Sequence, residues 1–314
     1  MIMINLNKKE FAKHYAIKKD LPYINQVASI NHPKSLSLMF CKLYKPEYEE
    51  RLLDIEDSIL FVNIDADITG EILEKNIVIY AINPRMEYVL TLNKFIVKEK
   101  KSYPKESYYI DPSAKVHHTC IIEPGVFIDN NVLIGINCHI KSGVKIRSNV
   151  SIGDNCVIGS NTVIGDVGFG IERLNQLPWS RIPMKGDPMK MPHLGGVIIG
   201  DNVELGALNS IVSGAIDPTI VSDYVKTDDH VHVAHNCFLG IGVLITAAAE
   251  LSGGVKIGRD SWIGPNCSIF QQKKIGERCV VGLGANIFKD MENDEIYIGT
   301  PSRKLKKDNK NNEK

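Results

Sequence analysis

Residues 110–164 read, in groups of six, IDPSAK VHHTCI IEPGVF IDNNVL IGINCH IKSGVK IRSNVS IGDNCV IGSNTV I. Every group begins with isoleucine or valine, so ten consecutive sixth positions carry a β-branched aliphatic side chain. An α-helix repeats every ~3.6 residues and a strand every two, so neither produces this spacing. A short strand followed by a corner, repeated along the chain, does produce it. The stretch therefore predicts a β-solenoid whose turns stack their apolar residues on one another.

A second run keeps the same spacing between residues 221 and 287. Its sixth positions are Val221, Thr227, Val233, Leu239, Ile245, Leu251, Ile257, Ile263, Ile269, Ile275, Val281 and Ile287, of which only Thr227 is polar. Corners need residues that tolerate positive φ, and glycine, asparagine and aspartate supply them. Asparagines stand where the corners are expected, at Asn130, Asn131, Asn137, Asn149, Asn155 and Asn161. Three hexapeptides complete one triangular coil, so equivalent residues of successive coils are expected to stack at roughly the 4.8 Å strand spacing.

The six-residue spacing is interrupted twice. Residues 166–197 contain Gly168, Gly170 and several prolines, and we interpret them as a long excursion from the solenoid. Long loops in compact folds are often functional. The second interruption lies between Ile211 and Val221, around Asp217, where a tolerated insertion explains the change of phase equally well.

Composition excludes several classes of protein. The formal net charge of the 314 residues is zero, which gives no indication of nucleic-acid binding. The hydrophobic content of 44% suits a globular protein, and no apolar run approaches the length of a membrane span. With no signal-peptide pattern at the N-terminus, we expect a cytoplasmic protein without membrane insertion. Six cysteines stand two positions before an apolar sixth residue and are interpreted as core thiols: Cys120, Cys138, Cys156, Cys237, Cys267 and Cys279.

The first 104 residues lack the hexapeptide spacing. An amphipathic helix is expected from Lys8 to Lys18, strands at 58–63 and 76–81, and a further helix over 84–95. We therefore predict a small α/β domain over 1–104, a solenoid over 105–300, and a flexible basic tail over 301–314.

Three histidines lie close together in the sequence His230-Val-His232-Val-Ala-His235. Alternation places His230 and His232 on one face of a strand, but a corner near His235 argues against a shared zinc ion. We interpret His235 instead as a general base facing outward near that corner, although a surface histidine without a function is the simpler alternative. One coil further on stands Gly253, whose backbone N–H is free of a side chain and suited to bind an oxyanion. A base and a donor one strand spacing apart suit acyl transfer from a thioester to an amine.

Several motifs then resemble one family, the UDP-3-O-(3-hydroxyacyl)glucosamine N-acyltransferases of lipid A assembly. These are residues 165–170 (GDVGFG), 191–192 (MP), 196–200 (GVIIG), 202–207 (NVELGA), 214–217 (GAID), Asp228 and 233–236 (VAHN). The resemblance implies a mainly β protein, a left-handed parallel β-helix (hexapeptide solenoid) with a small N-terminal α/β domain that binds a nucleotide. It also implies a homotrimer with active sites between subunits, a catalytic histidine at His235 and an oxyanion glycine at Gly253.

The chain departs from the family at substrate contacts. The family's second active-site histidine, which touches the acyl hydroxyl, falls at Gln272. Its uracil-reading aromatic–Asn-Pro–Tyr pattern is matched only by Phe40, Lys45-Pro46 and Tyr48. Those two aromatic residues are expected to stack a pyrimidine or, equally well, to be core residues. The ending IGTPSRKL at 298–305 resembles CoA-dependent sugar acetyltransferases.

These departures predict transfer of acetyl or 3-hydroxybutyryl from acyl-CoA to a nucleotide-linked (dTDP- or UDP-) amino sugar for O-antigen or capsule. The alternative is the lipid A N-acyltransferase itself, which uses acyl carrier protein; neither prediction includes a permanently bound cofactor or a metal. The predicted catalytic residues are His235 and Gly253. The predicted substrate-binding residues are Phe40, Tyr48, Asp217, Asp228, Asn236 and Gln272, and either aspartate is a candidate to assist His235.

One alternative from a different class remains. Hexapeptide solenoids also serve as non-catalytic scaffolds and as γ-carbonic-anhydrase-like metal enzymes. A metal enzyme would need three histidines that converge across subunits, and His117, His118 and His139 are the available candidates. Their spacing departs from that pattern.

Overall fold

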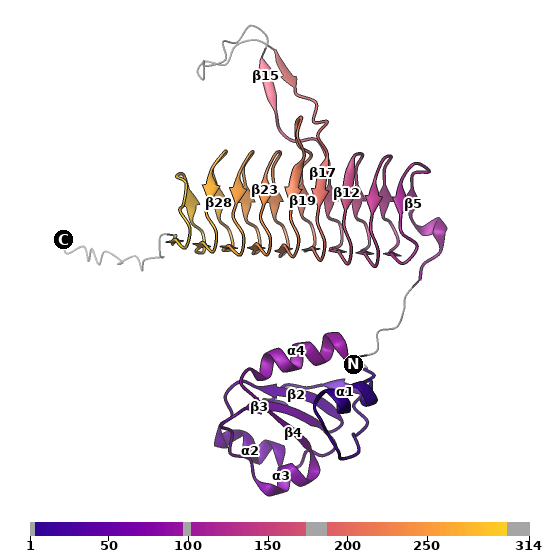
Figure 1. Ribbon diagram of the computed structural model, residues 1–314, viewed down its shortest axis with the longest axis vertical. Coiled ribbons are helices and arrows are strands. Elements are labelled where there is room, and N and C mark those ends of the chain that lie inside the picture. The colour runs from indigo at the N-terminus through magenta and orange to yellow at the C-terminus, as the bar shows by residue number, and fades with distance from the viewer. Residues whose placement is uncertain (1–3, 97–101, 174–186, 300–314) are drawn as a thin grey trace, which may run out of the picture. The chain divides into compact units, whose positions relative to one another are not determined.

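The computed structural model describes residues 4–96, 102–173 and 187–299. The chain divides into two compact units, Met1–Lys100 and Lys101–Lys314 (Figure 1). The predicted basic tail at 301–314, and most of the 298–305 ending, lie outside the described residues.

The N-terminal unit is a parallel four-stranded sheet with short helices. Its strands are β1 (Gln26–Val27), β2 (Ser37–Cys41), β3 (Ile59–Asn63) and β4 (Ile77–Ala81), in that spatial order. Its helices are α1 (Lys8–His14), η1 (Pro46–Tyr48), α2 (Glu49–Leu52), α3 (Gly70–Lys75) and α4 (Pro84–Lys94). Strand β3 is buried from Ile59 to Val62, as expected for a parallel sheet covered on both faces. The predicted helices and strands at 8–18, 58–63, 76–81 and 84–95 correspond to α1, β3, β4 and α4, and α1 ends four residues early.

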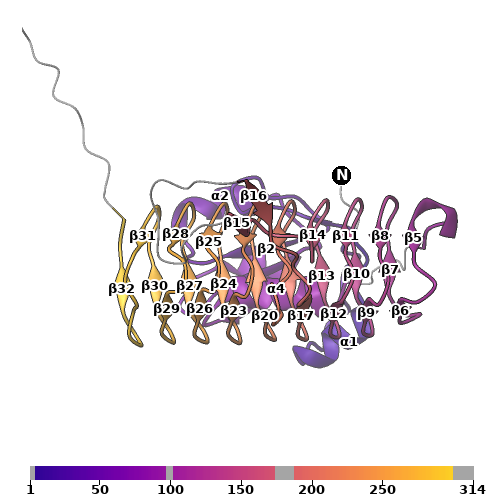
Figure 2. The same ribbon diagram turned by 90° about the horizontal axis from the view of Figure 1, so that it is seen from above.

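The second unit is a three-sided parallel solenoid preceded by η2 (Lys105–Ser107). Sheet 1 contains β5 (Tyr109–Ile110), β8 (Phe127–Ile128), β11 (Lys145–Ile146), β14 (Val163–Ile164), β19 (Ser210–Ile211), β22 (His232–Val233), β25 (Glu250–Leu251), β28 (Ser268–Ile269) and β31 (Asn286–Ile287). Sheet 2 contains β6 (Lys115–Val116), β9 (Leu133–Ile134), β12 (Val150–Ile152), β17 (Val197–Ile199), β20 (Thr219–Val221), β23 (Phe238–Leu239), β26 (Lys256–Ile257) and β29 (Lys274–Ile275). Sheet 3 contains β7 (Ile121–Ile122), β10 (His139–Ile140), β13 (Val157–Ile158), β18 (Glu204–Leu205), β21 (Lys226–Thr227), β24 (Leu244–Ile245), β27 (Trp262–Ile263), β30 (Val280–Val281) and β32 (Ile296–Tyr297). Figure 2 shows how the coils follow one another along the solenoid axis.

The apolar sixth positions form the solenoid core. Each strand pairs with the strand one coil away, as in Ile140 with Ile158 and Val233 with Leu251. Thr227, the polar exception, is buried, and its hydroxyl accepts a hydrogen bond from the Gly206 N–H at 3.1 Å. The predicted core thiols are buried at Cys138, Cys156, Cys237, Cys267 and Cys279, whereas Cys120 in the first full coil is half-buried.

Left-handed residues make the corners. Asn131, Asn137, Asn149, Asn155 and Asn161 all have φ between 55° and 62°, which accounts for these asparagines in the sequence, whereas Asn130 does not adopt a positive φ. Asparagine tolerates this conformation, in which most side chains collide with the backbone. Less tolerant residues occupy it at Leu208, Tyr224 and Ala248.

The predicted excursion leaves the solenoid between β14 and β17 and contains a projecting hairpin (Figure 1). Its strands, β15 (Ile171–Arg173) and β16 (Pro188–Lys190), are antiparallel. The chain returns along the solenoid, where Gly196 forms a bridge with Gly214. The second interruption, at 212–218, therefore lies directly against the end of the first.

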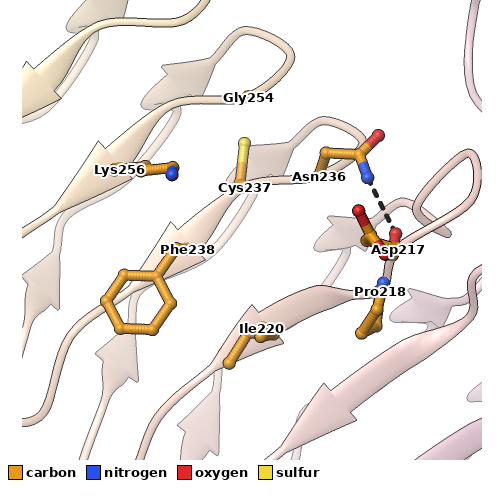
Figure 3. Close-up of a pocket in the computed structure, with 8 residues that line it drawn as sticks. All are labelled: Asp217, Pro218, Ile220, Asn236, Cys237, Phe238, Gly254 and Lys256. Carbon is orange, nitrogen blue, oxygen red and sulfur yellow. Dashed lines mark hydrogen bonds between the residues drawn. The ribbon is translucent and has the colours of Figure 1, made fainter.

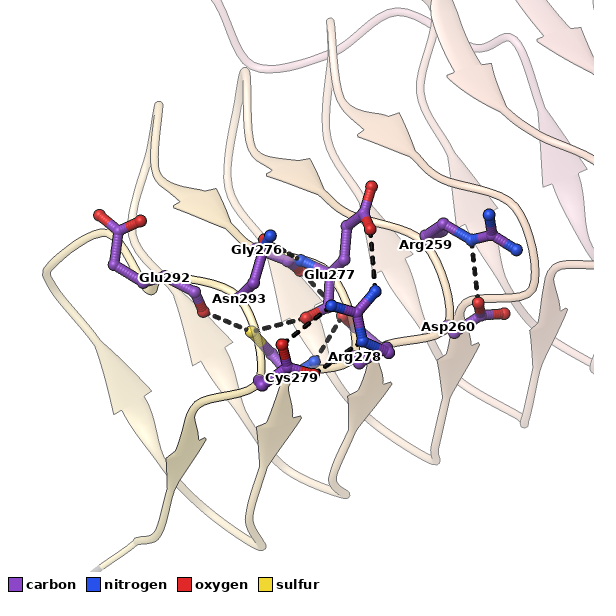
Figure 4. A network of polar contacts seen from close by, with 10 residues as sticks. Arg259, Asp260, Gly276, Glu277, Arg278, Cys279, Glu292 and Asn293 are labelled. Carbon is purple, nitrogen blue, oxygen red and sulfur yellow. Dashed lines mark hydrogen bonds and ion pairs between the residues drawn. The ribbon is translucent and has the colours of Figure 1, made fainter.

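Ion pairs line one edge of the last coils (Figure 4). Arg278 makes a two-pronged contact with Asp294 at 2.7 and 2.8 Å and contacts Glu277 at 3.0 Å. The pKa of Asp294 is lowered by the hydrogen bond from Arg278. Both side chains are exposed, so the network adds little to stability.

Candidate functional site

His235 lies at the corner where the chain passes from sheet 1 to sheet 2. The pairing of β22 with β25 stacks this corner on the corner that contains Gly253. The two corners are joined by a hydrogen bond from the Gly254 N–H to the His235 carbonyl at 2.9 Å. The predicted pair of residues is thus brought together on neighbouring coils.

The imidazole of His235 faces Gly253 across this short gap. A β-carbon added to Gly253 would stand 2.6 Å from His235 Nε2, so any larger residue would have to displace the ring. Among the described residues, the Gly253 N–H has no hydrogen-bond acceptor. Glycine is therefore required here by the position of the ring and leaves a backbone donor available beside it.

Asn236 fixes the tautomer of His235. The His235 Nδ1 atom lies 3.1 Å from the Asn236 side-chain oxygen, and the same oxygen accepts the Ala215 N–H at 3.1 Å. The Asn236 amide nitrogen donates to the Asp217 carbonyl oxygen at 2.7 Å, which settles which end of the amide is which. Because the oxygen can only accept, the ring proton is on Nδ1, and Nε2 carries the lone pair that faces Gly253.

A cavity of about 510 Å³, here called the histidine cavity, opens on the outer side of sheet 1. Its walls come from the excursion and from four successive coils, and include Gly168, Phe169, His232, His235, Glu250 and Gly253. A volume of this size suits a small-molecule ligand.

A second groove, of about 580 Å³, lies on the sheet 2 side of the same corner and is called the sheet 2 groove. Figure 3 shows its apolar floor of Ile220 and Phe238, with Lys256 at one end and the hydrogen bond between Asn236 and Asp217 at the other. The His235 corner is therefore flanked by a cavity on each side.

His193 is a residue that the sequence analysis missed. It follows β16, is only 7% exposed, and packs edge-to-face on His235 with ring centroids 5.3 Å apart. Its position in the predicted excursion was the available signal, but sequence spacing does not relate the excursion to a particular coil.

Two of the predicted substrate-binding residues, Asp217 and Gln272, lie at or next to the His235 corner. Asp217 is at the corner, but its backbone carbonyl, through Asn236, makes the contact rather than its carboxylate. Gln272 donates its N–H to the Gly253 carbonyl at 2.9 Å, while its neighbour Gln271 lines the histidine cavity.

Asp228 is not part of this corner. It is exposed at the corner between sheets 3 and 1, separated from His235 by strand β22. The prediction that Asp228 assists His235 does not agree with this position.

Phe40 and Tyr48 both line a pocket of about 420 Å³ in the N-terminal unit, together with Asn31 and Lys45. The ring of Phe40 also packs against the ring of Tyr88, with the ring centroids 4.9 Å apart. The two aromatic residues are half-buried, so each is both a packing residue and part of an accessible wall.

The histidine motif does not form a metal site within one chain. His230 is in a left-handed corner, His232 is in a strand and His235 is in the next corner, so the expectation that His230 and His232 share a strand face is wrong. His139 instead contacts Glu123 at 2.7 Å, and the rings of His117 and His118 lie against each other at a tilt of 37°. Within residues 4–96, 102–173 and 187–299, no three histidine, cysteine or acidic side chains are grouped to hold a metal. None of the helices in these ranges has the length and apolar run that a membrane span requires.

Comparisons with known proteins agree with this architecture. Residues 131–166 match the family model described as bacterial transferase hexapeptide (six repeats). Two solved structures of UDP-N-acetylglucosamine acyltransferases, from Campylobacter jejuni and Francisella novicida, are 26% and 27% identical, with TM-scores of 0.51 and 0.52. Each covers 61% of this chain, and the matches span 68% and 65% of those chains. The predicted fold class, a left-handed parallel β-helix, is confirmed.

Curated relatives carry the name UDP-3-O-acylglucosamine N-acyltransferase. The protein of Campylobacter curvus is 32% identical over 36% of this chain, that of Hahella chejuensis 40% over 33%, and that of a Caulobacter strain 30% over 47%. The matches span 36%, 27% and 41% of those relatives, so the chain matches less than half of their length.

These names correct one prediction. The expected short-chain branch, which transfers acetyl or 3-hydroxybutyryl from acyl-CoA for O-antigen or capsule, is wrong, because these relatives bear the name of the alternative. The departures at Gln272 and around Phe40 do not by themselves indicate a different donor or acceptor, since single substrate contacts can change within one reaction class. The chain is a hexapeptide-repeat protein that resembles the UDP-3-O-acylglucosamine N-acyltransferases.

Proposed function

We propose that the protein is an N-acyltransferase that transfers an acyl group from a thioester to the amine of UDP-3-O-acylglucosamine. The observation that carries this proposal is the position of His235 Nε2 against Gly253 at the edge of a cavity of about 510 Å³. The names of the relatives support the acceptor, and the resemblance of the sequence motifs implies acyl carrier protein as the donor.

The reaction needs a proton acceptor and an oxyanion donor. His235 Nε2 takes a proton from the sugar amine as the amine nitrogen attacks the thioester carbonyl carbon. The Gly253 N–H donates a hydrogen bond to the negative oxygen of the tetrahedral intermediate. When the C–S bond breaks, the imidazolium returns the proton to the departing thiolate, leaving an amide and a free thiol.

Asn236 supports this cycle through the Nδ1 side of the ring. Its side-chain oxygen accepts a hydrogen bond from the Nδ1–H of His235, which keeps the lone pair on Nε2. The same oxygen lies beside the ring when His235 becomes positively charged. Ala215 and the Asp217 carbonyl hold the amide itself, so Asn236 has little freedom to turn.

The N-terminal unit is assigned a nucleotide-binding role in this proposal. Phe40 and Tyr48 offer aromatic rings at one pocket, and an aromatic wall suits a uracil ring. We also propose a homotrimer, because one solenoid leaves its flanks exposed and a closed assembly covers them.

Product analysis tests the function. The purified full chain is incubated with UDP-3-O-(3-hydroxyacyl)glucosamine and a 3-hydroxyacyl carrier protein, and products are identified by mass spectrometry. The proposal expects a product heavier by one acyl group, in which mild alkali removes the original 3-O-acyl ester and leaves the new acyl group in place, as expected of an amide. An ester product, or no transfer from any thioester donor, would contradict it.

A further inference from the structure

The excursion places a second imidazole on the proposed base. His193 packs against His235 with the rings 71° apart and their centroids separated by 5.3 Å. This edge-to-face arrangement is a favoured geometry for aromatic rings. The contact joins two segments that lie 42 residues apart in the sequence.

His193 is itself held firmly. Its Nδ1 lies 3.0 Å from the Met191 carbonyl oxygen, and because a carbonyl only accepts, Nδ1 carries the proton. Gly168 covers the opposite edge of the ring: a β-carbon there would stand 2.9 Å from His193 Nε2. The ring is therefore fixed by a hydrogen bond on one edge and by close backbone on the other.

The Nε2 atom of His193 is a buried polar atom without a partner among the described residues. Leaving such an atom unsatisfied lowers the stability of the folded state, and an apolar ring of similar shape would avoid that loss. The unsatisfied Nε2 adds nothing to the stability of the fold, so the contribution of this side chain lies in its ring, which packs against His235.

We propose that His193 is a positioning residue for His235. It lies against one side of the His235 ring, while Asn236 holds the Nδ1 edge, so that Nε2 stays turned toward Gly253. Catalytic groups must be held within about 0.5 Å of the productive geometry, and a displacement of about 1 Å can cost ~100-fold in rate. This inference rests on the proposed function, in which His235 is the base.

This proposal also gives the excursion a role at the site. Val167, Gly168 and Phe169 line the histidine cavity, and Gly168 also contacts His193. One segment of chain therefore both walls the cavity and secures the residue behind the base.

Three variants test the role of His193. The His193→Ala protein loses the ring, His193→Phe keeps the ring without its nitrogens, and His193→Gln keeps a polar group without the ring. For His193→Ala we expect kcat to fall at least tenfold, with KM for both substrates changed less than twofold. We expect His193→Phe to recover most of the loss and His193→Gln to recover little.

Nitrogen NMR of ¹⁵N-histidine-labelled protein reports on His235 without reference to activity, with His235→Asn identifying its signals. We expect one Nδ1-protonated tautomer in the unaltered protein and in His193→Phe, and a mixture of tautomers in His193→Ala. An unchanged His235 spectrum in His193→Ala, or a rise in KM at constant kcat, would overturn the proposal. If the unaltered protein transfers no acyl group, the proposed function fails while the spectra still decide whether His193 orders His235.

Discussion

The Nε2 atom of His235 lies against Gly253 so closely that a β-carbon on that glycine would stand 2.6 Å away. The contact joins a ring on one coil to the backbone of a glycine on the next. It follows directly from the pairing of β22 with β25, because the solenoid stacks equivalent corners. The fold itself therefore assembles the base and the donor that thioester aminolysis needs.

Gly253→Ala is expected to reduce kcat by about 100-fold or more, because the new methyl group must displace the His235 ring. The melting temperature should change by no more than a few degrees, since the side chain of His235 can move outward. Steady-state kinetics and thermal unfolding of the purified variant provide the measurement. Gly70→Ala is the matched control, as nothing lies within 4 Å of a β-carbon there. A Gly253→Ala protein with full kcat would show that catalysis does not require the His235 ring to lie against residue 253.

Asn236→Gly is expected to lower kcat by roughly tenfold, because the His235 Nδ1 proton loses its acceptor. Glycine is chosen because Asn236 has a φ of 59°, which glycine adopts without strain. Asn266→Gly removes another left-handed asparagine, with a φ of 55°, and should leave kcat unchanged. Equal losses in the two variants would mean that general weakening of the solenoid, rather than His235, is responsible.

The hydrogen bond between Glu123 and His139 is expected to make the free energy of unfolding depend on pH in the acid range. Burial acts to raise the pKa of Glu123, but hydrogen bonds from His139 and the Ser142 N–H bring it below its ordinary value of 4.5. A folded pKa below the unfolded value means that the ionised carboxylate stabilises the fold above about pH 4.5 and loses this effect as the pH falls.

We therefore expect Glu123→Gln to unfold more easily than the unaltered protein at pH 7, by about 1 kcal/mol. The difference should shrink toward zero as the pH falls through the folded pKa of Glu123. Urea unfolding at a series of pH values tests this. A difference that grows in acid would reverse the sign and contradict the assignment.

Ala248→Asn is expected to stabilise the solenoid. Ala248 is exposed and has a φ of 58°, the conformation that asparagine occupies at Asn131 and Asn266. Relieving this strain is worth about 1 kcal/mol, which should appear as a higher melting temperature. Ala247→Asn, at the neighbouring position without positive φ, should show no gain.

The solenoid was predictable because each hexapeptide repeats one local rule. Ile110, Ile128 and Ile146 point to the same column whatever the rest of the chain does, and asparagines mark the left-handed corners. The N-terminal sheet was harder to predict from the sequence, since the short strands β1 and β2 carry no such repetition. Its two predicted strands, β3 and β4, are the continuous apolar runs.

The site was predictable where it depended on register and not where it depended on contacts between distant segments. His235 and Gly253 follow from an 18-residue coil. His193 did not, because the excursion returns to the solenoid at a place that spacing does not encode. The role of Asn236 toward Nδ1 was missed in favour of Asp217 and Asp228, since side-chain direction at a corner depends on its local hydrogen bonds.

The most direct test of the account compares two histidine variants in the N-acylation assay. His235→Asn removes the proposed base, and His230→Asn changes an exposed histidine in a left-handed corner that asparagine tolerates. We predict that kcat/KM for acyl transfer to the sugar amine falls by about 10²–10⁴-fold in His235→Asn and stays within twofold in His230→Asn, with both proteins folded. A His235→Asn protein that forms the amide at the unaltered rate would contradict the central claim.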